Sequence, residues 1–157
     1  MEWPCLKVVT MSKNKNKIFI ATPISAFKSK EEYAGYRKIV LELIEQLKPN
    51  YEVYSEIELI RDDYDYESPE QAAVKDLDQI DESDIFIIHH PKRLQTSTFI
   101  ELGYALALKK KIIIISSLSD LPYLANGIIE SENVYYLKSH EITKNIIQQL
   151  ISIINKI

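Results

Sequence analysis

The stretch that decides the fold is residues 85–115, which read IFIIHHPKRLQTSTFIELGYALALKKKIIII. Two short apolar runs, residues 85–88 and 112–115, flank a segment at 98–108 whose apolar side chains recur with helical spacing. A strand, a helix and a second strand in this order are typical of a βαβ unit with parallel strands. Because neither run has a polar face, both strands should be buried on both sides, with helices covering the sheet.

The same pattern continues on both sides of this unit. Further strands are predicted at residues 18–21, 51–54 and 134–137, and further helices at 30–48, 68–82 and 140–155. The second of these helices begins with Ser68-Pro69-Glu70-Gln71, which has a capping serine, a proline at the first helical position and a glutamine that closes a capping box. The sequence therefore predicts an α/β fold, a single doubly wound (flavodoxin- or Rossmann-like) five-stranded parallel sheet with helices on both faces.

Length and composition indicate one globular domain. The chain has 157 residues, close to the roughly 150 expected of a single domain. Residues 1–16 are weakly patterned and are expected to form a flexible leader, and residues 17–157 the domain. Hydrophobic residues make up 46% and charged residues 27%, which excludes extensive disorder. No apolar run is long enough to cross a bilayer, so no membrane partner and a cytoplasmic location are expected.

Several function classes are excluded by composition. The net charge of −4 disfavours binding to a nucleic acid polymer, whose phosphates require a basic surface. The three glycines, Gly35, Gly103 and Gly127, are too scattered for a dinucleotide-binding fingerprint or a P-loop. A single cysteine excludes an intramolecular disulfide and a cysteine-cluster zinc site. We therefore expect neither a metal nor a cofactor.

Two carboxylates stand out near the expected ligand crevice. Parallel sheets bind ligands at the carboxyl ends of their strands, which points to residues 22–29, 55–67, 89–97 and 116–127. Glu101 falls in the first turn of a predicted helix, where the helix dipole favours an ionised carboxylate that suits a nucleophile. The spacing from Thr98 to Glu101 equally fits a capping box with no role in chemistry.

Asp76 lies at the edge of a stripe that Ala73, Leu77 and Ile80 are predicted to bury. A carboxylate there either reaches solvent or a lysine, or it is paired, protonated or part of a site. Burial raises the pKa of a carboxyl, which is what a general acid requires near neutral pH. Two carboxylates at one crevice are also the general equipment for cleaving a glycosidic bond.

Other polar residues have simpler interpretations. His89 and His90 are expected to be loop residues at the rim of the cleft, because nothing completes a metal-ligand set with them. Lys92 and Arg93 could meet a phosphate, although a solvated loop is the favoured interpretation. Tyr33 and Tyr36 are expected to face the core and not to stack on a base.

These residues together resemble a known family. The strand and turn IFIATPIS at 18–25, the helix and strand VKDLDQIDESDIFII at 74–88, and STFIELGYALALKKKIIII at 97–115 are similar to the nucleoside 2-deoxyribosyltransferase family, which includes nucleoside 5′-monophosphate N-glycosidases. The resemblance covers roughly residues 17–137. Its most specific piece is ELGYALA at 101–107, which resembles the family's E-[IL]-G-x-A-x-A segment.

The resemblance implies roles for individual residues. Glu101 would be the catalytic nucleophile and Asp76 the second functional carboxylate. Asn126 would reach into a neighbouring subunit's site in a homodimer or higher homo-oligomer. The other implied substrate contacts are Pro23, Ser25, Thr96 and Ser97.

Three hypotheses follow for the function. The first is cleavage or transfer at the N-glycosidic bond of a nucleoside or nucleoside 5′-monophosphate, through a glycosyl-enzyme intermediate on Glu101. The second is a TIR-like domain that cleaves NAD, although such domains have a Trp-Cys pair where this chain has Ser97-Thr98. The third is a nucleotide-sensing module that binds without turnover.

Overall fold

The computed structural model of the chain describes residues 15–61, 66–94 and 96–157. The prediction of a leader at residues 1–16 therefore lies almost entirely outside the described residues. In the described part, no helix combines the length and the apolar character needed to cross a membrane. The elements, in chain order, are β1 Lys17–Ala21, α1 Lys30–Leu47, β2 Glu52–Tyr54, the 3₁₀ helix η1 Glu56–Glu58, α2 Pro69–Glu82, β3 Ile85–His90, α3 Thr98–Ala107, β4 Lys111–Ser116, α4 Tyr123–Ile128, β5 Val134–Lys138 and α5 Lys144–Ile154.

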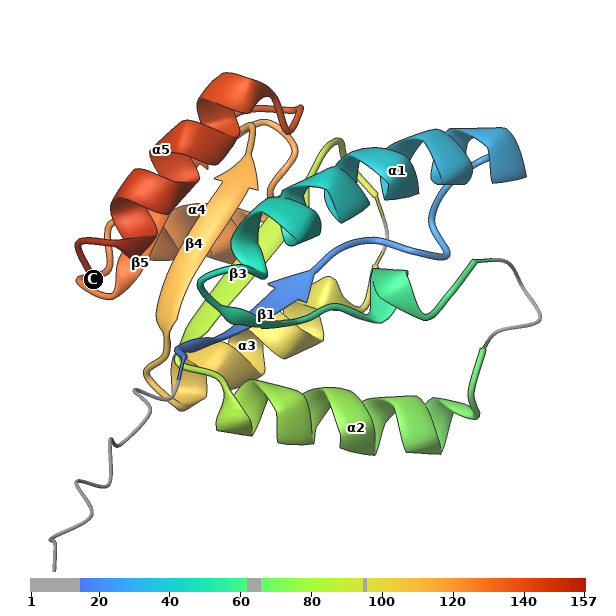
Figure 1. Cartoon of the computed structure of the whole chain (residues 1–157), viewed down its shortest axis with the longest axis horizontal. Helices are drawn as coiled ribbons and strands as arrows, with labels where there is room; N and C mark the ends of the chain where they lie inside the picture. Colours follow the sequence, from blue (N-terminus) through green and yellow to red (C-terminus); the bar gives the residue numbers. More distant parts are fainter. Residues whose placement is uncertain (1–14, 62–65, 95) are drawn as a thin grey trace, which may run out of the picture.

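The five strands form one parallel sheet in the order β2-β1-β3-β4-β5 (Figure 1). At its centre Ile87 of β3 pairs with Ile20 of β1 and with Ile113 of β4. The prediction of a doubly wound parallel sheet is confirmed. Because the chain moves outward in one direction from β1 to β2 and in the other direction from β3 onward, a crevice forms between the carboxyl ends of β1 and β3.

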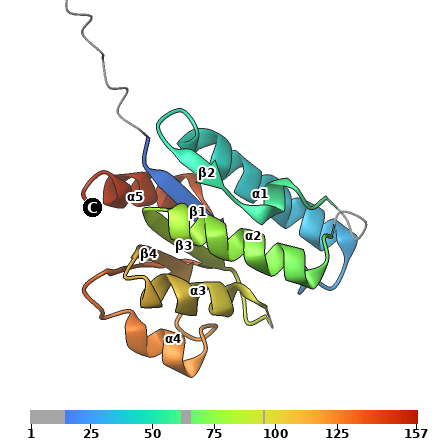
Figure 2. The ribbon, with the colours of Figure 1, turned by 90° about the horizontal axis from the view of Figure 1, so that it is seen from below.

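Alternation along the strands divides the core into two layers. Side chains such as Ile20, Ile87 and Ile113 pack on one face with α1 and α5. Phe19 and Phe86, whose rings stack 5.6 Å apart, pack on the other face with α2, α3 and α4. Figure 2 shows these three helices lying side by side on the near side of the sheet. Burial of both faces explains why the strands read as continuous apolar runs in the sequence.

The ends of some elements differ from the prediction. His89 and His90 are the last residues of β3, not loop residues, because they pair with Ile115 and Ser116 of a longer β4. They are 2% and 0% exposed, so the expectation of histidines at the cleft rim is wrong. The closing helix starts at Lys144, later than predicted. The short elements η1 and α4 were not predicted, because six residues or fewer show too little periodicity.

The two helices nearest the crevice begin in different ways. At α2 the predicted capping box is confirmed, since Ser68 Oγ accepts a hydrogen bond from the Gln71 backbone and the Gln71 side chain accepts one from the Ser68 N–H. At α3 the predicted capping box of Thr98 with Glu101 is wrong. Ser97 is the N-cap residue, without a side-chain capping bond, and Thr98 is already helical. Glu101 therefore takes no part in a capping box at the start of α3.

Candidate active site

A cavity of about 340 Å³ opens at the carboxyl ends of β1, β2 and β3, between α2 and α3. This volume lies in the range of small-molecule sites. Three of the four segments predicted to bind a ligand contribute to it, and 116–127 does not. The acidic residues that line it are Glu56, Glu67, Asp76 and Glu101. Besides Tyr66, the lining residues that carry a hydroxyl are Thr22, Ser25, Thr96 and Ser97. Its aliphatic walls include Ala72, Ala73, Leu77 and Ile100.

Asp76 lies on the buried side of α2 and is 8% exposed. The buried stripe is rotated from the predicted one, because Asp76 and Ile80 are buried whereas Ala73 is exposed and lines the cavity. The Tyr54 hydroxyl donates a hydrogen bond of 3.1 Å to Asp76 Oδ1. Burial raises the pKa of Asp76, and the Tyr54 bond opposes that rise. The site thus holds an uncommon buried carboxyl that retains its proton more readily than an exposed one.

Glu101 occupies the first turn of α3 and lines the same cavity. Burial, followed by the charges of Asp76 and Glu56, raises its pKa from 4.5 to about 8. The attraction of a helix N-terminus for a carboxylate is worth about 0.3–1 kcal/mol. The rise in pKa corresponds to several kcal/mol in the opposite direction. At Glu101, burial and like charge therefore outweigh the favourable effect of the helix dipole on the carboxylate.

Glu56 is a third carboxyl of the cavity, and the sequence analysis missed it. It is the first residue of η1, directly after β2. Ser55 fixes this turn, because its Oγ donates a 2.8 Å hydrogen bond to the carbonyl of Ile20 in β1. Burial, and then the charge of Asp76, raises the pKa of Glu56 to about 7. The sequence did indicate that Glu56 lies just after a strand. An acidic loop at a binding site, however, has the same composition as an acidic loop that is merely exposed to solvent.

The other predicted substrate contacts divide into two groups. Ser25, Thr96 and Ser97 line the cavity, whereas Pro23 is buried and is not part of its lining. Asn126 also lies outside the lining, on α4. Its Nδ2 donates a 3.3 Å hydrogen bond to the Leu121 carbonyl. Its Oδ1 is buried and has no partner among the residues that the structure describes.

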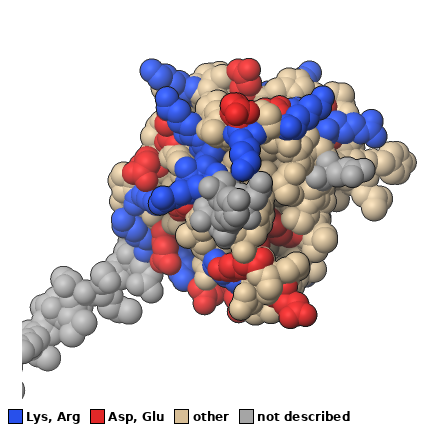
Figure 3. Space-filling view, turned by 90° about the vertical axis from the view of Figure 1, so that its right-hand side faces the viewer, with Lys and Arg blue, Asp and Glu red and all other residues tan. Residues whose placement is uncertain are grey.

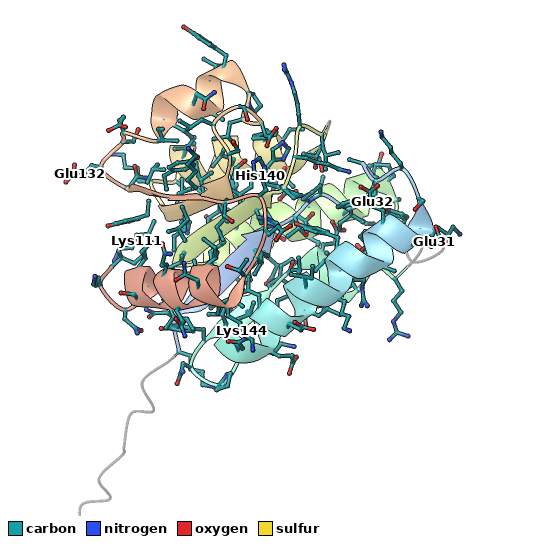
Figure 4. The ribbon with its side chains drawn as sticks, turned by 90° about the horizontal axis from the view of Figure 1, so that it is seen from above. Glu31, Glu32, Lys111, Glu132, His140 and Lys144 are labelled. Carbon is teal, nitrogen blue, oxygen red and sulfur yellow. The ribbon has the colours of Figure 1, made fainter. Side chains whose placement is uncertain are left out.

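Several polar residues near the crevice serve the fold. The Tyr36 hydroxyl lies 2.9 Å from Nδ1 of His89, whose pKa burial lowers to about 4. As predicted, Tyr33 and Tyr36 pack in the core layer of α1. Lys92 forms an ion pair with Glu32, which Figure 4 labels at the N-terminal end of α1. In the described ranges no group of three or more His, Cys, Asp or Glu side chains is placed to hold a metal ion.

Charge is unevenly spread over the face onto which the strand ends open (Figure 3). Acidic side chains are prominent along its lower edge, where α2 lies, and basic ones gather in its upper and left-hand parts, with some acidic ones among them at the top. A second hollow of about 330 Å³ adjoins the cavity, because both are lined by Ile24, Ser25 and Tyr66. Lys28 lines only this second hollow. A ligand extending past Ser25 would therefore pass from an acidic chamber toward a cation.

Comparisons with known proteins agree with the fold. Residues 18–141 match the model of the nucleoside 2-deoxyribosyltransferase family. Among solved structures, the chain is similar to the Clostridium botulinum CMP N-glycosidase BcmB, with 26% identity, 87% of this chain and 99% of that chain covered, and a TM-score of 0.60. It is similar in fold to BlsM, with 19% identity, coverage of 90% and 95%, and a TM-score of 0.63. No curated protein matches the chain.

Proposed function

The chain belongs to the nucleoside 2-deoxyribosyltransferase family, and on this premise we propose that it cleaves or transfers at the N-glycosidic bond of a nucleoside or nucleoside 5′-monophosphate. The observation that carries the proposal is that Glu101 and Asp76, which come from different helices, line one cavity at the switch point of the sheet. One carboxyl can attack the sugar while the other donates a proton to the departing base. Similarity to a CMP N-glycosidase supports the same class of bond.

In the proposed first step, an oxygen of ionised Glu101 attacks the anomeric carbon. The bond from that carbon to the base nitrogen breaks, and a glycosyl ester forms on Glu101. With a pKa of about 8, about a tenth of Glu101 is ionised at pH 7. Asp76 assists by giving a proton to the departing base, a contribution typically worth about 10²–10⁴-fold in rate.

In the second step, water or another base attacks the same carbon and releases Glu101. We propose that the aliphatic walls formed by Ala73, Leu77 and Ile100 hold the flat base, because ligand sites use apolar surfaces for such rings. The hydroxyls of Ser25 and Ser97 then face the sugar. A 5′-phosphate that points past Ser25 would approach Lys28 in the adjoining hollow.

We further propose that Asn126 completes the site of a second subunit. The helix that carries it, α4, presents Tyr123 and Leu124, which are 91% and 80% exposed. On α3, the helix beside α4 in Figure 2, Ile100 is 74% exposed and lines the cavity. Large apolar side chains exposed together are typical of an interaction surface. A homodimer through this surface would bring one subunit's α4 near its partner's cavity.

The proposal is tested by incubating the purified protein with nucleosides, nucleoside 5′-monophosphates and NAD, and measuring free base by chromatography. Base should be released from at least one nucleoside or nucleotide, and Glu101→Ala should release none. Release of nicotinamide from NAD alone would favour the TIR-like hypothesis. Tight binding without any release would favour a sensing module, and either result would overturn the proposal.

A further inference from the structure

Tyr54 binds one oxygen of Asp76 from outside the cavity. Its hydroxyl donates a hydrogen bond of 3.1 Å to Asp76 Oδ1. Asp76 lines the cavity, whereas Tyr54 is not among the described residues that line it. Tyr54 is the last residue of β2, and Asp76 lies 22 positions later, on α2. The bond therefore ties a carboxyl of the cavity to the edge strand of the sheet.

Three features fix the position of Tyr54. In the sheet it pairs with Phe19 of β1, and the two rings lie 5.3 Å apart at a tilt of 31°. The next residue, Ser55, is held by the 2.8 Å hydrogen bond from its Oγ to the Ile20 carbonyl. The Tyr54 ring also packs against the core layer that α2, α3 and α4 cover. Because the ring has little freedom to move, its hydroxyl can hold Asp76 in one orientation.

The hydrogen bond decides which oxygen of Asp76 carries the acidic proton. Burial, followed by the charge of Asp76, raises the pKa of Tyr54 far above its ordinary value, so the hydroxyl stays a donor near neutral pH. In a protonated carboxyl one oxygen bears the proton and the other accepts hydrogen bonds. Since Oδ1 accepts from Tyr54, the proton of Asp76 belongs on Oδ2.

We propose that Tyr54 is a positioning residue for the proton transfer, because by binding Oδ1 it leaves Oδ2 to carry the proton and directs it to the departing base. This inference rests on the proposed function, in which Asp76 is the proton donor, and adds a residue to it. Once the proton has left, the same hydroxyl donates to a carboxylate. Hydrogen bonds to an ionised acceptor are roughly twice as strong as those between neutral groups. Tyr54 thus orients the acid before the transfer and stabilises its charge afterwards.

The surroundings of Asp76 make this bond important for its carboxylate form. In the described part of the chain, the titratable side chains around Asp76 besides Tyr54 are Glu56 from η1, Glu67 from the loop before α2, Lys75 from α2 and Glu101 from α3. Lys75 is the one cation in this set, and a 2.9 Å ion pair with Glu67 largely balances its charge. Burial raises the pKa of Asp76, and the Tyr54 bond is the largest influence that lowers it. Removing the hydroxyl should therefore raise the pKa of Asp76 further.

The proton and electron balance of the two steps is complete. In the first step the O–H bond at Asp76 Oδ2 breaks and its proton goes to a ring nitrogen of the base, the electrons of the glycosidic bond move to the base, and Glu101 forms the ester. In the second step water attacks the anomeric carbon, its proton returns to Asp76, and Glu101 leaves as a carboxylate. When another base is the acceptor, its ring N–H supplies that proton. Tyr54 donates to Oδ1 throughout and keeps its own proton.

The first test compares Tyr54→Phe with a matched control, Tyr51→Phe. Phenylalanine keeps the ring and removes only the hydroxyl, and in the control the lost hydroxyl is one that donates a 2.7 Å hydrogen bond to Asn155 Oδ1, away from the cavity. We expect Tyr54→Phe to lower kcat at pH 4.5 by about 10–100-fold with little change in KM, because an acid that is no longer oriented loses part of its contribution. The control should keep wild-type kcat.

The pH dependence separates this role from a merely structural one. In Tyr54→Phe the pKa of Asp76 should be higher, so the variant retains the acidic proton at a pH where the wild type has lost more of it. The deficit in kcat should therefore be several times smaller at pH 8 than at pH 4.5, about 3-fold or more. A structural defect would lower kcat by the same factor at both pH values. Equal deficits, or an unchanged kcat, would overturn the proposal.

The second test does not depend on turnover. Carbon NMR of the labelled Asp76 carboxyl in the full chain should show its titration midpoint at higher pH in Tyr54→Phe than in the wild type and in Tyr51→Phe. A midpoint that does not move would overturn the inference. If the wild-type protein releases no base from any substrate, the proposed function fails. The NMR titration still decides whether Tyr54 controls the proton of Asp76.

Discussion

Replacing Glu101 by glutamine should abolish turnover and at the same time stabilise the protein at alkaline pH. Burial and neighbouring carboxyls raise the pKa of Glu101 from 4.5 to about 8. Between these values the folded state holds a proton that the unfolded chain has lost. Stability therefore falls as the pH rises through this window. Glutamine carries no charge at any pH, so Glu101→Gln removes this loss.

The size of the effect follows from the change in proton affinity. At about 1.4 kcal/mol for each tenfold change, the ceiling at pH 9 is about 5 kcal/mol. The repulsion among the three carboxylates also involves Asp76 and Glu56, which can adjust when the charge of Glu101 is removed. We therefore expect Glu101→Gln to raise the free energy of unfolding by about 1–3 kcal/mol at pH 9. Near pH 4, where the carboxyl is protonated in both states, the gain should vanish.

Thermal unfolding of the wild type and Glu101→Gln at pH 4.5 and pH 9 measures this difference. For a domain of this size, about 1–3 kcal/mol raises Tm by about 3–9 °C at pH 9. Glu42→Gln, on the exposed side of α1, is the matched control and should show no pH-dependent gain. Equal Tm differences at the two pH values, or a lower Tm at pH 9, would refute the reasoning. Retained turnover would refute the role of Glu101.

Three further outcomes are expected. Asp76→Asn should lower kcat by about 10²–10⁴-fold and leave ligand binding by calorimetry nearly intact, and an unchanged pH–rate profile would count against its role. Thr98→Val should leave stability in denaturant unchanged or raise it by up to about 1 kcal/mol, because the Thr98 hydroxyl is buried with no partner among the described residues; a loss of about 0.5–2 kcal/mol would indicate a capping role after all. Mixed Glu101→Ala and Asn126→Ala subunits, each inactive alone, should regain about a quarter of wild-type activity, since half of the dimers carry one intact site; full activity of a monomer in light scattering would contradict the shared site.

The fold was predictable because its signals are local. Each strand is a short apolar run, and the proline and glutamine after Ser68 mark the start of α2 without reference to the rest of the chain. His89 and His90 were misplaced because β3 continues for as long as β4 offers backbone partners, up to Ser116. That pairing is a tertiary property. Polar residues that follow an apolar run do not show in the sequence whether the strand continues through them.

The site was predictable only in part, for a related reason. Glu101 and Asp76 could be proposed from their places on helices and from the family resemblance. The place of Glu56 depends on η1, on the Ser55 bond to β1 and on the way α2 packs back against the crevice. The ionisation of Glu101 could not be predicted either. Its pKa is set by burial and by two carboxyls 25 and 45 positions earlier in the chain.

The central claim is that Glu101 carries the sugar between the two steps. Mass spectrometry of the protein, quenched in acid during turnover of the substrate that the base-release assay identifies, tests this directly. The account predicts a fraction of protein heavier by one glycosyl group, with the added mass on the peptide that contains Glu101, and no such species in Glu101→Gln. A nucleoside with fluorine at the 2′ position, which slows release of the ester, should increase that fraction. Base release without any added mass, even with the fluorinated substrate, or an adduct on another residue, would contradict the account.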